Sequence, residues 1–128
     1  MVEKILISFG AISAFKNKKF DFSVLHLDAH CDLMDEYKKS KLNFATVMRR
    51  IREMGIEVIS VGVRSFDKET ENYLKKEKIK VFKAPKIPIK EILRKLKKSV
   101  YLSFDFDVLD PSIMPSVSCP VPGGLGFY

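Results

Sequence analysis

Short apolar runs alternate with helical patterns along almost the whole chain, and this alternation limits the possible folds. The apolar runs are rich in β-branched and aromatic residues, are bounded by polar segments and have the length of strands. The predicted strands are Phe22–Asp28, Glu57–Val63, Lys80–Lys83 and Val100–Asp107. Strands that alternate with helices form βαβ units, so the sequence predicts an α/β fold with a mostly parallel sheet covered by helices.

The helices are predicted from apolar residues at helical spacing and from the signals at their ends. They are Phe9–Phe15, Phe44–Met54, Lys68–Glu77 and Ile89–Lys98. Asn43 and Asp67 are suitable N-cap residues, and Gly55 stands where a helix commonly ends in the left-handed conformation. The last 18 residues, 111–128, contain four prolines and three glycines and are predicted to form a loop.

Length and composition indicate one domain spanning residues 1–128. Hydrophobic residues make up 46% of the chain and charged residues 30%, as in ordinary globular proteins. No apolar run approaches the roughly 20 residues of a membrane span, and no signal-peptide pattern opens the chain, so we expect no membrane partner and a cytoplasmic location. Cys31 and Cys119 alone do not suggest a disulfide framework.

The formal net charge of +7 raises the alternative of a nucleic-acid partner. The lysines, however, are scattered over predicted helices and loops, without interleaved exposed aromatic residues or a known binding motif. They fall mainly in Lys16–Lys19, Lys38–Lys41, Lys75–Lys90 and Lys95–Lys98. We therefore favour a solvated lysine-rich surface and expect no nucleic-acid partner.

Two predicted strands end in clusters of ionisable residues, "VLHLDAHCD" and "SFDFDVLDP". If the strand conformation persists, Asp28, His30 and Asp32 share one face, and so do Asp105 and Asp107. Parallel α/β sheets place their ligands at the carboxyl ends of strands, so both clusters are expected at one site.

Four carboxylates at the rim of an apolar sheet repel one another and resist desolvation, so a positive partner is expected. Two divalent cations would balance the four aspartates, and His30 would add a nitrogen ligand. An oxygen-rich site with few imidazoles suits manganese better than zinc. The alternative is a set of unrelated carboxylates at loop starts, which one cluster alone would not exclude. Cys31, between two ligand positions, is expected to face away.

The motifs "LDAHCD", "SFDFDVLDP" and "PVPGGL" closely resemble those of the ureohydrolases, the arginase and agmatinase group, and "MDEY" and "ATVMRRI" are most similar to the agmatinase branch. The resemblance implies an arginase-like three-layer α/β/α fold, a binuclear manganese centre and hydrolysis of a guanidinium group, such as that of agmatine, to urea and an amine. It also suggests a homo-oligomer, either a trimer or a hexamer.

Carried over by position, the resemblance assigns the metal ligands and two neighbouring residues. The ligands are Asp28, His30, Asp32, Asp105 and Asp107, with Asp28 and Asp105 as the bridges. Asp110 resembles a supporting residue. His26 is more consistent with a core or supporting histidine than with a ligand.

The sequence also departs from the family pattern at named positions. A further histidine ligand of the family aligns with Ile5, and the serine after it with Leu6. A histidine near the substrate in related agmatinases aligns with Phe44. The family continues past "PGGL" to an acidic residue for the guanidinium and to further strands, so we expect a fold incomplete at both ends. These departures leave a second interpretation, a non-catalytic remnant that keeps the fold and part of the metal binding.

Overall fold

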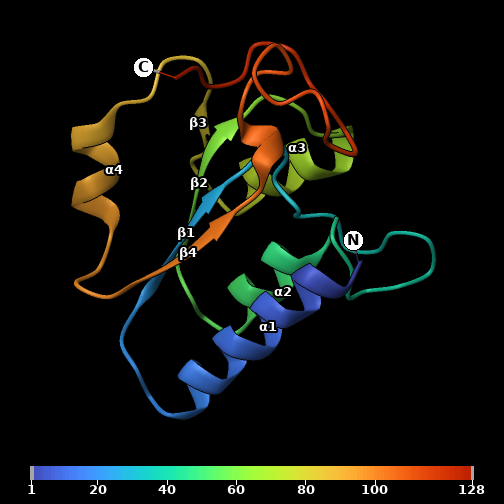
Figure 1. The fold of residues 1–128 in the computed structure, drawn as a ribbon. Coiled ribbons are helices and arrows are strands. Elements are labelled where there is room, and N and C mark those ends of the chain that lie inside the picture. Colours follow the sequence, from blue (N-terminus) through green and yellow to red (C-terminus); the bar gives the residue numbers. More distant parts are fainter. Residues whose placement is uncertain (1, 128) are drawn as a thin grey trace.

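The computed structural model describes residues 2–127, with side chains from residue 7 onward (Figure 1). Ile5 and Leu6 therefore belong to a described helix, but their side chains lie outside the described part. The helices are α1 (Val2–Asn17), α2 (Val47–Glu53), α3 (Lys68–Lys76) and α4 (Ile89–Lys95), followed by the short 3-10 helix η1 (Phe106–Val108). The strands are β1 (Ser23–Leu27), β2 (Val58–Val63), β3 (Phe82–Lys83) and β4 (Val100–Phe104).

The four strands form one parallel sheet in the order β3-β2-β1-β4. The predicted α/β architecture with a parallel sheet is thus confirmed, and every predicted strand is present with somewhat narrower bounds. In the register, Leu25 lies beside Ile59 of β2 and beside Leu102 of β4. Because all neighbouring strands are parallel, the chain crosses over the sheet between successive strands. The carboxyl ends of the four strands therefore lie at one edge of the sheet.

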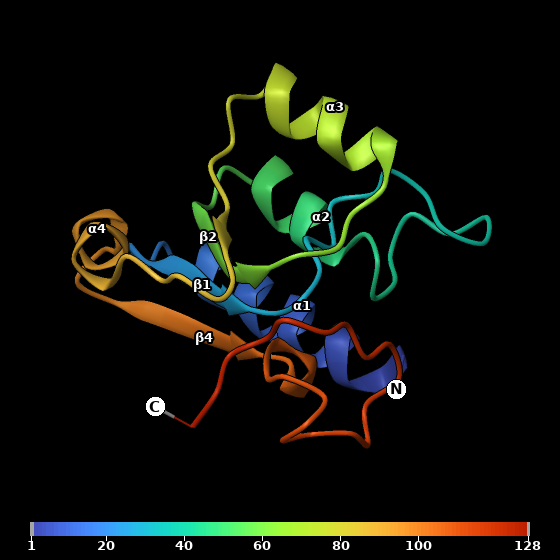
Figure 2. The same cartoon turned by 90° about the horizontal axis from the view of Figure 1, so that it is seen from above.

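Helices cover both faces of the sheet and produce three layers (Figure 2). On one face, Ile12 of α1, Ile51 of α2 and Leu74 of α3 pack against the strands in one core cluster. On the other face, Ile92 of α4 packs against Ile59 and other residues of a smaller cluster. Successive strand residues point to opposite faces, so each strand contributes to both clusters.

The face that carries α4 is only partly covered. Leu102 and Phe104 of β4 share this face with their register partners Leu25 and Leu27, yet they are 55% and 45% exposed. We call the exposed apolar side chains of β4, η1 and α4 the outer apolar face. Its members are Ile89, Leu93, Val100, Leu102, Phe104 and Phe106.

Several predicted helix bounds are wrong. The helix predicted at Phe9–Phe15 runs over the whole of α1, and the one predicted to end at Lys98 stops at Lys95. Asn43 does not cap α2, which begins at Val47. Its side chain instead accepts from Ala45 N at 3.0 Å and donates to the Tyr37 carbonyl at 2.8 Å, so it closes the preceding turn.

Two end signals were correct. Asp67 caps α3, because its Oδ1 accepts from Thr70 N at 2.7 Å. Gly55 follows α2 at a φ of 76°, a left-handed conformation that glycine adopts without steric cost. Among the described residues no helix is long and apolar enough to cross a membrane.

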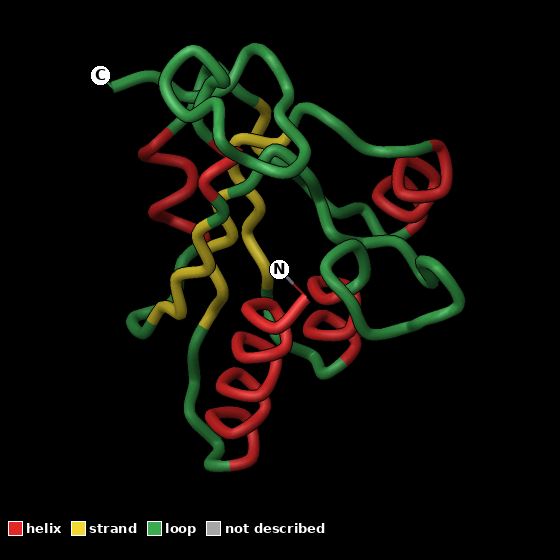
Figure 3. The backbone as a smooth tube through the Cα atoms, turned by 45° about the vertical axis from the view of Figure 1, so that its right-hand side comes forward, coloured by secondary structure: helices red, strands yellow, loops and turns green. Residues whose placement is uncertain are grey.

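Long loops gather at the carboxyl ends of the strands (Figure 3). They follow β1 and β4, and residues 111–127 form the largest part of the C-terminal loop, as predicted; the short connection 64–67 after β2 ends at the same edge. This edge of the sheet is where the two acidic clusters of the sequence meet.

Candidate metal centre

The ligand segment after β1 leaves the strand conformation at once. Asp28 N still donates to the Val61 carbonyl at 3.1 Å, but the strand ends at Leu27. Asp32 has a φ of 54°, in the left-handed region, and its carbonyl accepts from Met48 N at the start of α2. The prediction that strand alternation places these ligands on one face is therefore wrong, and a turn brings them together instead.

The second ligand segment is also a turn. Asp105 N donates to the Leu27 carbonyl at 2.8 Å, which ties the end of β4 to the end of β1. The chain then enters η1, where Asp107 N donates to Asp105 Oδ1 at 3.0 Å. Asp107 thus lies in a helical turn and not in the predicted strand.

Potential ligand atoms form two compact groups at this edge. One consists of His26, Asp28 and Asp32, and the other of Asp28, His30 and Asp107; in each group the atoms lie within 4.8 Å of one another. His26 Nε2 is 3.1 Å from Asp28 Oδ2 and 3.7 Å from Asp32 Oδ2. His30 Nδ1 is 3.2 Å from Asp28 Oδ1 and 3.1 Å from Asp107 Oδ2. Asp28 therefore connects the two groups.

In the second group, hydrogen bonds between His30 and its carboxylate partners shift the pKa values of His30 and Asp28. Hydrogen bonds to Asp107 and then Asp28 raise the pKa of His30 to about 10, against the opposing effect of burial. Burial opposes ionisation of Asp28, but its hydrogen bonds with His26 and His30 hold the pKa of this carboxyl below its usual range.

The first group is more deeply buried and lacks full charge compensation. Burial and then the charge of Asp28 raise the pKa of Asp32 well above its usual value. Burial also opposes a charge on His26, but the hydrogen bond with Asp28 and the nearby carboxylates raise its pKa. Burial, together with the charges of Asp107 and Asp28, raises the pKa of Asp105. Burial and mutual repulsion thus oppose ionisation of Asp32 and Asp105, and a cation bound among these carboxylates would relieve that repulsion.

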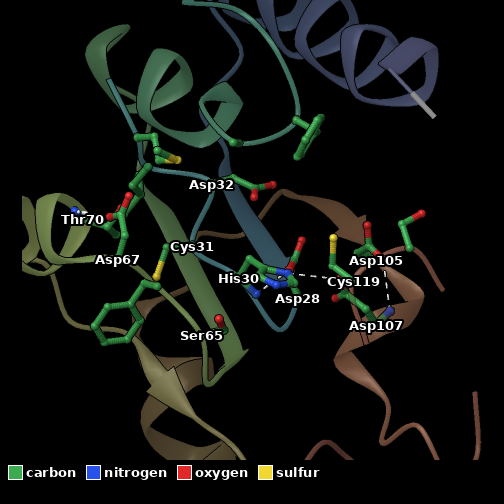
Figure 4. Close-up of a pocket in the computed structure, with 16 residues that line it drawn as sticks. Asp28, His30, Cys31, Asp32, Ser65, Asp67, Thr70, Asp105, Asp107 and Cys119 are labelled. Carbon is green, nitrogen blue, oxygen red and sulfur yellow. Dashed lines mark hydrogen bonds and ion pairs between the residues drawn. The ribbon is translucent and has the colours of Figure 1, made fainter. Parts of the chain in front are cut away.

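A cavity of about 400 Å³ opens above these groups (Figure 4). All five ligands carried over from the resemblance line it, which are Asp28, His30, Asp32, Asp105 and Asp107. Asp105 lies in neither compact group of described residues, although it lines the same cavity. Apolar side chains, including Leu33, Phe44 and Phe66, form the rest of the wall.

Phe44, which the resemblance aligned with a histidine of related agmatinases, lies in the cavity wall. Its ring packs edge-on against Tyr37, with the ring centroids 5.2 Å apart. A phenyl ring can pack there but can neither hold nor move a proton.

His26 lies where a core or supporting histidine was expected. We expected a core or supporting histidine, and its side chain is indeed buried, at 1% exposure. Its Nε2 nevertheless points at two of the carboxylates, while its Nδ1 lies 3.3 Å from Ser60 Oγ.

Cys31 was expected to face away from the ligands. It belongs to neither compact group of described residues, but it does line the cavity. Burial and the nearby charges of Asp32 and Asp28 raise the pKa of its thiol to about 12. The thiol therefore stays protonated near neutral pH and is a poor ligand there.

The donor set fits a hard divalent cation. Carboxylate oxygens predominate, with imidazole nitrogens beside them and no thiolate. The ion pairs of Asp28 within the described chain are both with histidines. Ser60 holds the far nitrogen of His26, which is the kind of contact that orients imidazoles at metal sites.

Known proteins are similar to this chain both in sequence and in fold. The arginase family profile matches residues 6–128. An N(1)-aminopropylagmatine ureohydrolase of Thermus thermophilus is 41% identical over 91% of this chain and 41% of its own length, and an agmatinase of Pyrococcus horikoshii is 38% identical over 83% of this chain and 38% of its own. The crystal structure of a presumed agmatinase from Clostridium difficile superposes with a TM-score of 0.85 at 34% identity, covering 95% of this chain and 46% of that one.

The chain thus spans about two fifths of the length of the curated relatives it matches. The residues matched by the family profile contain all four strands and both predicted ligand segments. The chain belongs to the arginase family.

Proposed function

We propose that the chain supplies the metal-binding part of a manganese-dependent ureohydrolase that cleaves a guanidinium C–N bond and releases urea. The observation that carries this proposal is the pair of imidazole–carboxylate groups joined through Asp28 at the carboxyl edge of the sheet. The names of the relatives support a small guanidino substrate such as agmatine. We also expect a cytoplasmic homo-oligomer, a trimer or a hexamer.

The proposed ligands are Asp28, His30, Asp32, Asp105 and Asp107, which all line one cavity. When bound, a pair of divalent ions would lower the pKa of a water molecule and polarise the group under attack. The apolar wall, including Leu33 and Phe66, excludes water and suits the methylene chain of a substrate.

A second candidate function is a non-catalytic ureohydrolase remnant that keeps the fold and part of the metal binding. Phe44 favours it, because this ring occupies the cavity wall where a proton-transfer group is expected. A positioned proton-transfer group contributes roughly 10²–10⁴-fold in rate. We therefore expect no measurable urea from agmatine or arginine when the chain alone is saturated with Mn²⁺.

A urea assay on four proteins tests these alternatives. They are the chain alone, the chain fused to the remaining part of the Thermus thermophilus relative, this fusion carrying Phe44→His, and the fusion carrying Phe66→His as a matched control in the same cavity. Activity only with Phe44→His would identify Phe44 as the decisive change. Robust turnover by the chain alone would overturn the remnant interpretation, and no turnover by any of the four would count against the hydrolase.

A further inference from the structure

We propose that Arg64 is the positioning residue that fixes the two ligand segments, Asp28–His30 and Asp105–Asp107, at their mutual distance. The role at the metal rests on the proposed function, whereas the geometry that follows does not. Arg64 stands directly after β2, which ends at Val63. It contacts one segment through its backbone and the other through its side chain.

The backbone of Arg64 holds the first ligand segment. Its N–H donates to the Ala29 carbonyl at 2.9 Å, and the N–H of Ser65 donates to the same oxygen at 3.1 Å. Ser65 and His30 also form an isolated parallel bridge. The peptide between Asp28 and His30 is thus fixed to the end of β2 whatever side chain stands at position 64.

The guanidinium of Arg64 holds the second segment entirely through backbone carbonyls. Nη2 donates to the Asp107 carbonyl at 2.6 Å and the Leu109 carbonyl at 3.2 Å, and Nη1 donates to the Val108 carbonyl at 3.2 Å. The Val121 carbonyl accepts from both Nε and Nη2, at 3.0 and 2.8 Å. The side chain therefore binds three successive peptides of the ligand turn and ties them to the C-terminal loop.

Asp107 is consequently held from two sides. Arg64 fixes its carbonyl, while its Oδ1 accepts from Ala29 N at 3.0 Å and its Oδ2 lies 3.1 Å from His30 Nδ1. Ala29 is thus bound to Arg64 through its carbonyl and to Asp107 through its N–H. These contacts close a ring that passes through both ligand segments.

Only an arginine suits this position. The planar guanidinium offers five N–H donors in a fixed fork, whereas lysine offers a single nitrogen. No carboxylate of the described residues forms an ion pair with Arg64, so its contacts serve the backbone and not charge neutralisation. A Cβ added to Gly124 would lie 2.7 Å from Arg64 Nη2, which shows how closely the C-terminal loop passes over the guanidinium.

The first measurement is the Mn²⁺ affinity, which is obtained by titration from the EPR signal of the free ion. It is made at a temperature at which circular dichroism shows each variant to be fully folded. Contacts that orient metal ligands typically change affinity by about 10–100-fold when removed, and we expect this loss for Arg64→Met and for Arg64→Lys. The matched control is Arg52→Met, because Arg52 donates to the Val58 carbonyl at the opposite end of β2. If Arg64→Met does not fold, Arg64→Lys decides.

The second measurement needs no metal. Hydrogen exchange of the Ala29 amide, which donates to Asp107 Oδ1, should become at least about tenfold faster in the Arg64 variants, while the Asp28 amide, bonded to Val61 in the sheet, should keep its rate. Unchanged affinity and unchanged Ala29 exchange would overturn the positioning role. A wild-type chain that binds no Mn²⁺ would overturn the proposed function instead, and the exchange measurement would still decide on Arg64.

Discussion

The carboxyl edge of the sheet and the outer apolar face differ in how their side chains are satisfied. At the edge, charged groups such as His26 and Asp28 are buried, and each has partners within the chain. On the outer apolar face, large side chains such as Leu102 are exposed. The carboxyl edge is therefore held by contacts within the described chain, whereas the outer apolar face adds little to the stability of the fold.

Removing the carboxylate that joins the two ligand groups should have the largest effect on metal binding at the carboxyl edge. Asp28→Asn keeps the shape but removes the charge shared by His26 and His30. We expect Mn²⁺ affinity to fall by at least about 100-fold, more than for residues that only orient ligands. Isothermal titration calorimetry measures the change, with Asp35→Asn as the control, because the partially exposed Asp35 pairs with Arg50 outside the site. Equal affinities for the two variants would contradict the assignment.

Saturating metal should stabilise the folded chain through the same edge. A ligand that binds only the folded state adds about 2.7 kcal/mol to the free energy of unfolding at 100 times its Kd. We expect millimolar Mn²⁺ to raise the melting temperature and Asp105→Asn to remove most of this rise. Identical melting with Mn²⁺ and with chelator would exclude a metal site in this chain.

Acid should weaken the C-terminal loop beside the edge. Hydrogen bonds from Ser112 and from the amides of Gly124 and Gly123 hold the pKa of Asp110 below its usual range. A depressed pKa stabilises the fold above the unfolded value, near 4, and this contribution is lost as the pH falls toward the folded pKa. Urea unfolding between pH 5 and pH 2 should show a shallower loss for Asp110→Asn than for the wild type. A steeper loss in the variant would refute this.

Polar substitutions on the outer apolar face should have the smallest effect on stability. Leu102→Ser and Phe104→Ser replace side chains that are already half exposed, so the free energy of unfolding should change by no more than about 0.5 kcal/mol. Light scattering should also show less self-association, because large exposed apolar patches promote it. The matched control is Leu33→Ser in the buried core. A loss above about 2 kcal/mol in either β4 variant would show that this face belongs to the core.

Local signals predicted most of the fold, and long-range contacts account for the errors. The cap at Asp67 depends on residues three positions apart, so the sequence suffices. The turn at Asp32 is held by the amides that open α2, which no local pattern predicts. Asn43 failed as a cap because the preceding turn competes for its side chain.

The candidate site shows the same division. Spacing and charge predicted that the five proposed ligands share one site, and all five line one cavity. The strand alternation that was used to align them is, however, absent. The contacts of Arg64 could not be predicted from the sequence. Its guanidinium binds backbone carbonyls 43 to 57 residues away, and every residue has such a carbonyl, so no sequence pattern marks them.

The strand order also has a consequence for how the chain is made. β1 lies between β2 and β4, and Ser23 finds its β4 partner only at Val100. During synthesis β1 and β2 can therefore meet before the peptides that carry Asp105 and Asp107 have left the ribosome. Because non-local parallel pairing is slow, one flank of β1 stays open until β4 has docked. The proposed ligand set is complete only after β4 has docked, so metal capture would follow the closing of the sheet.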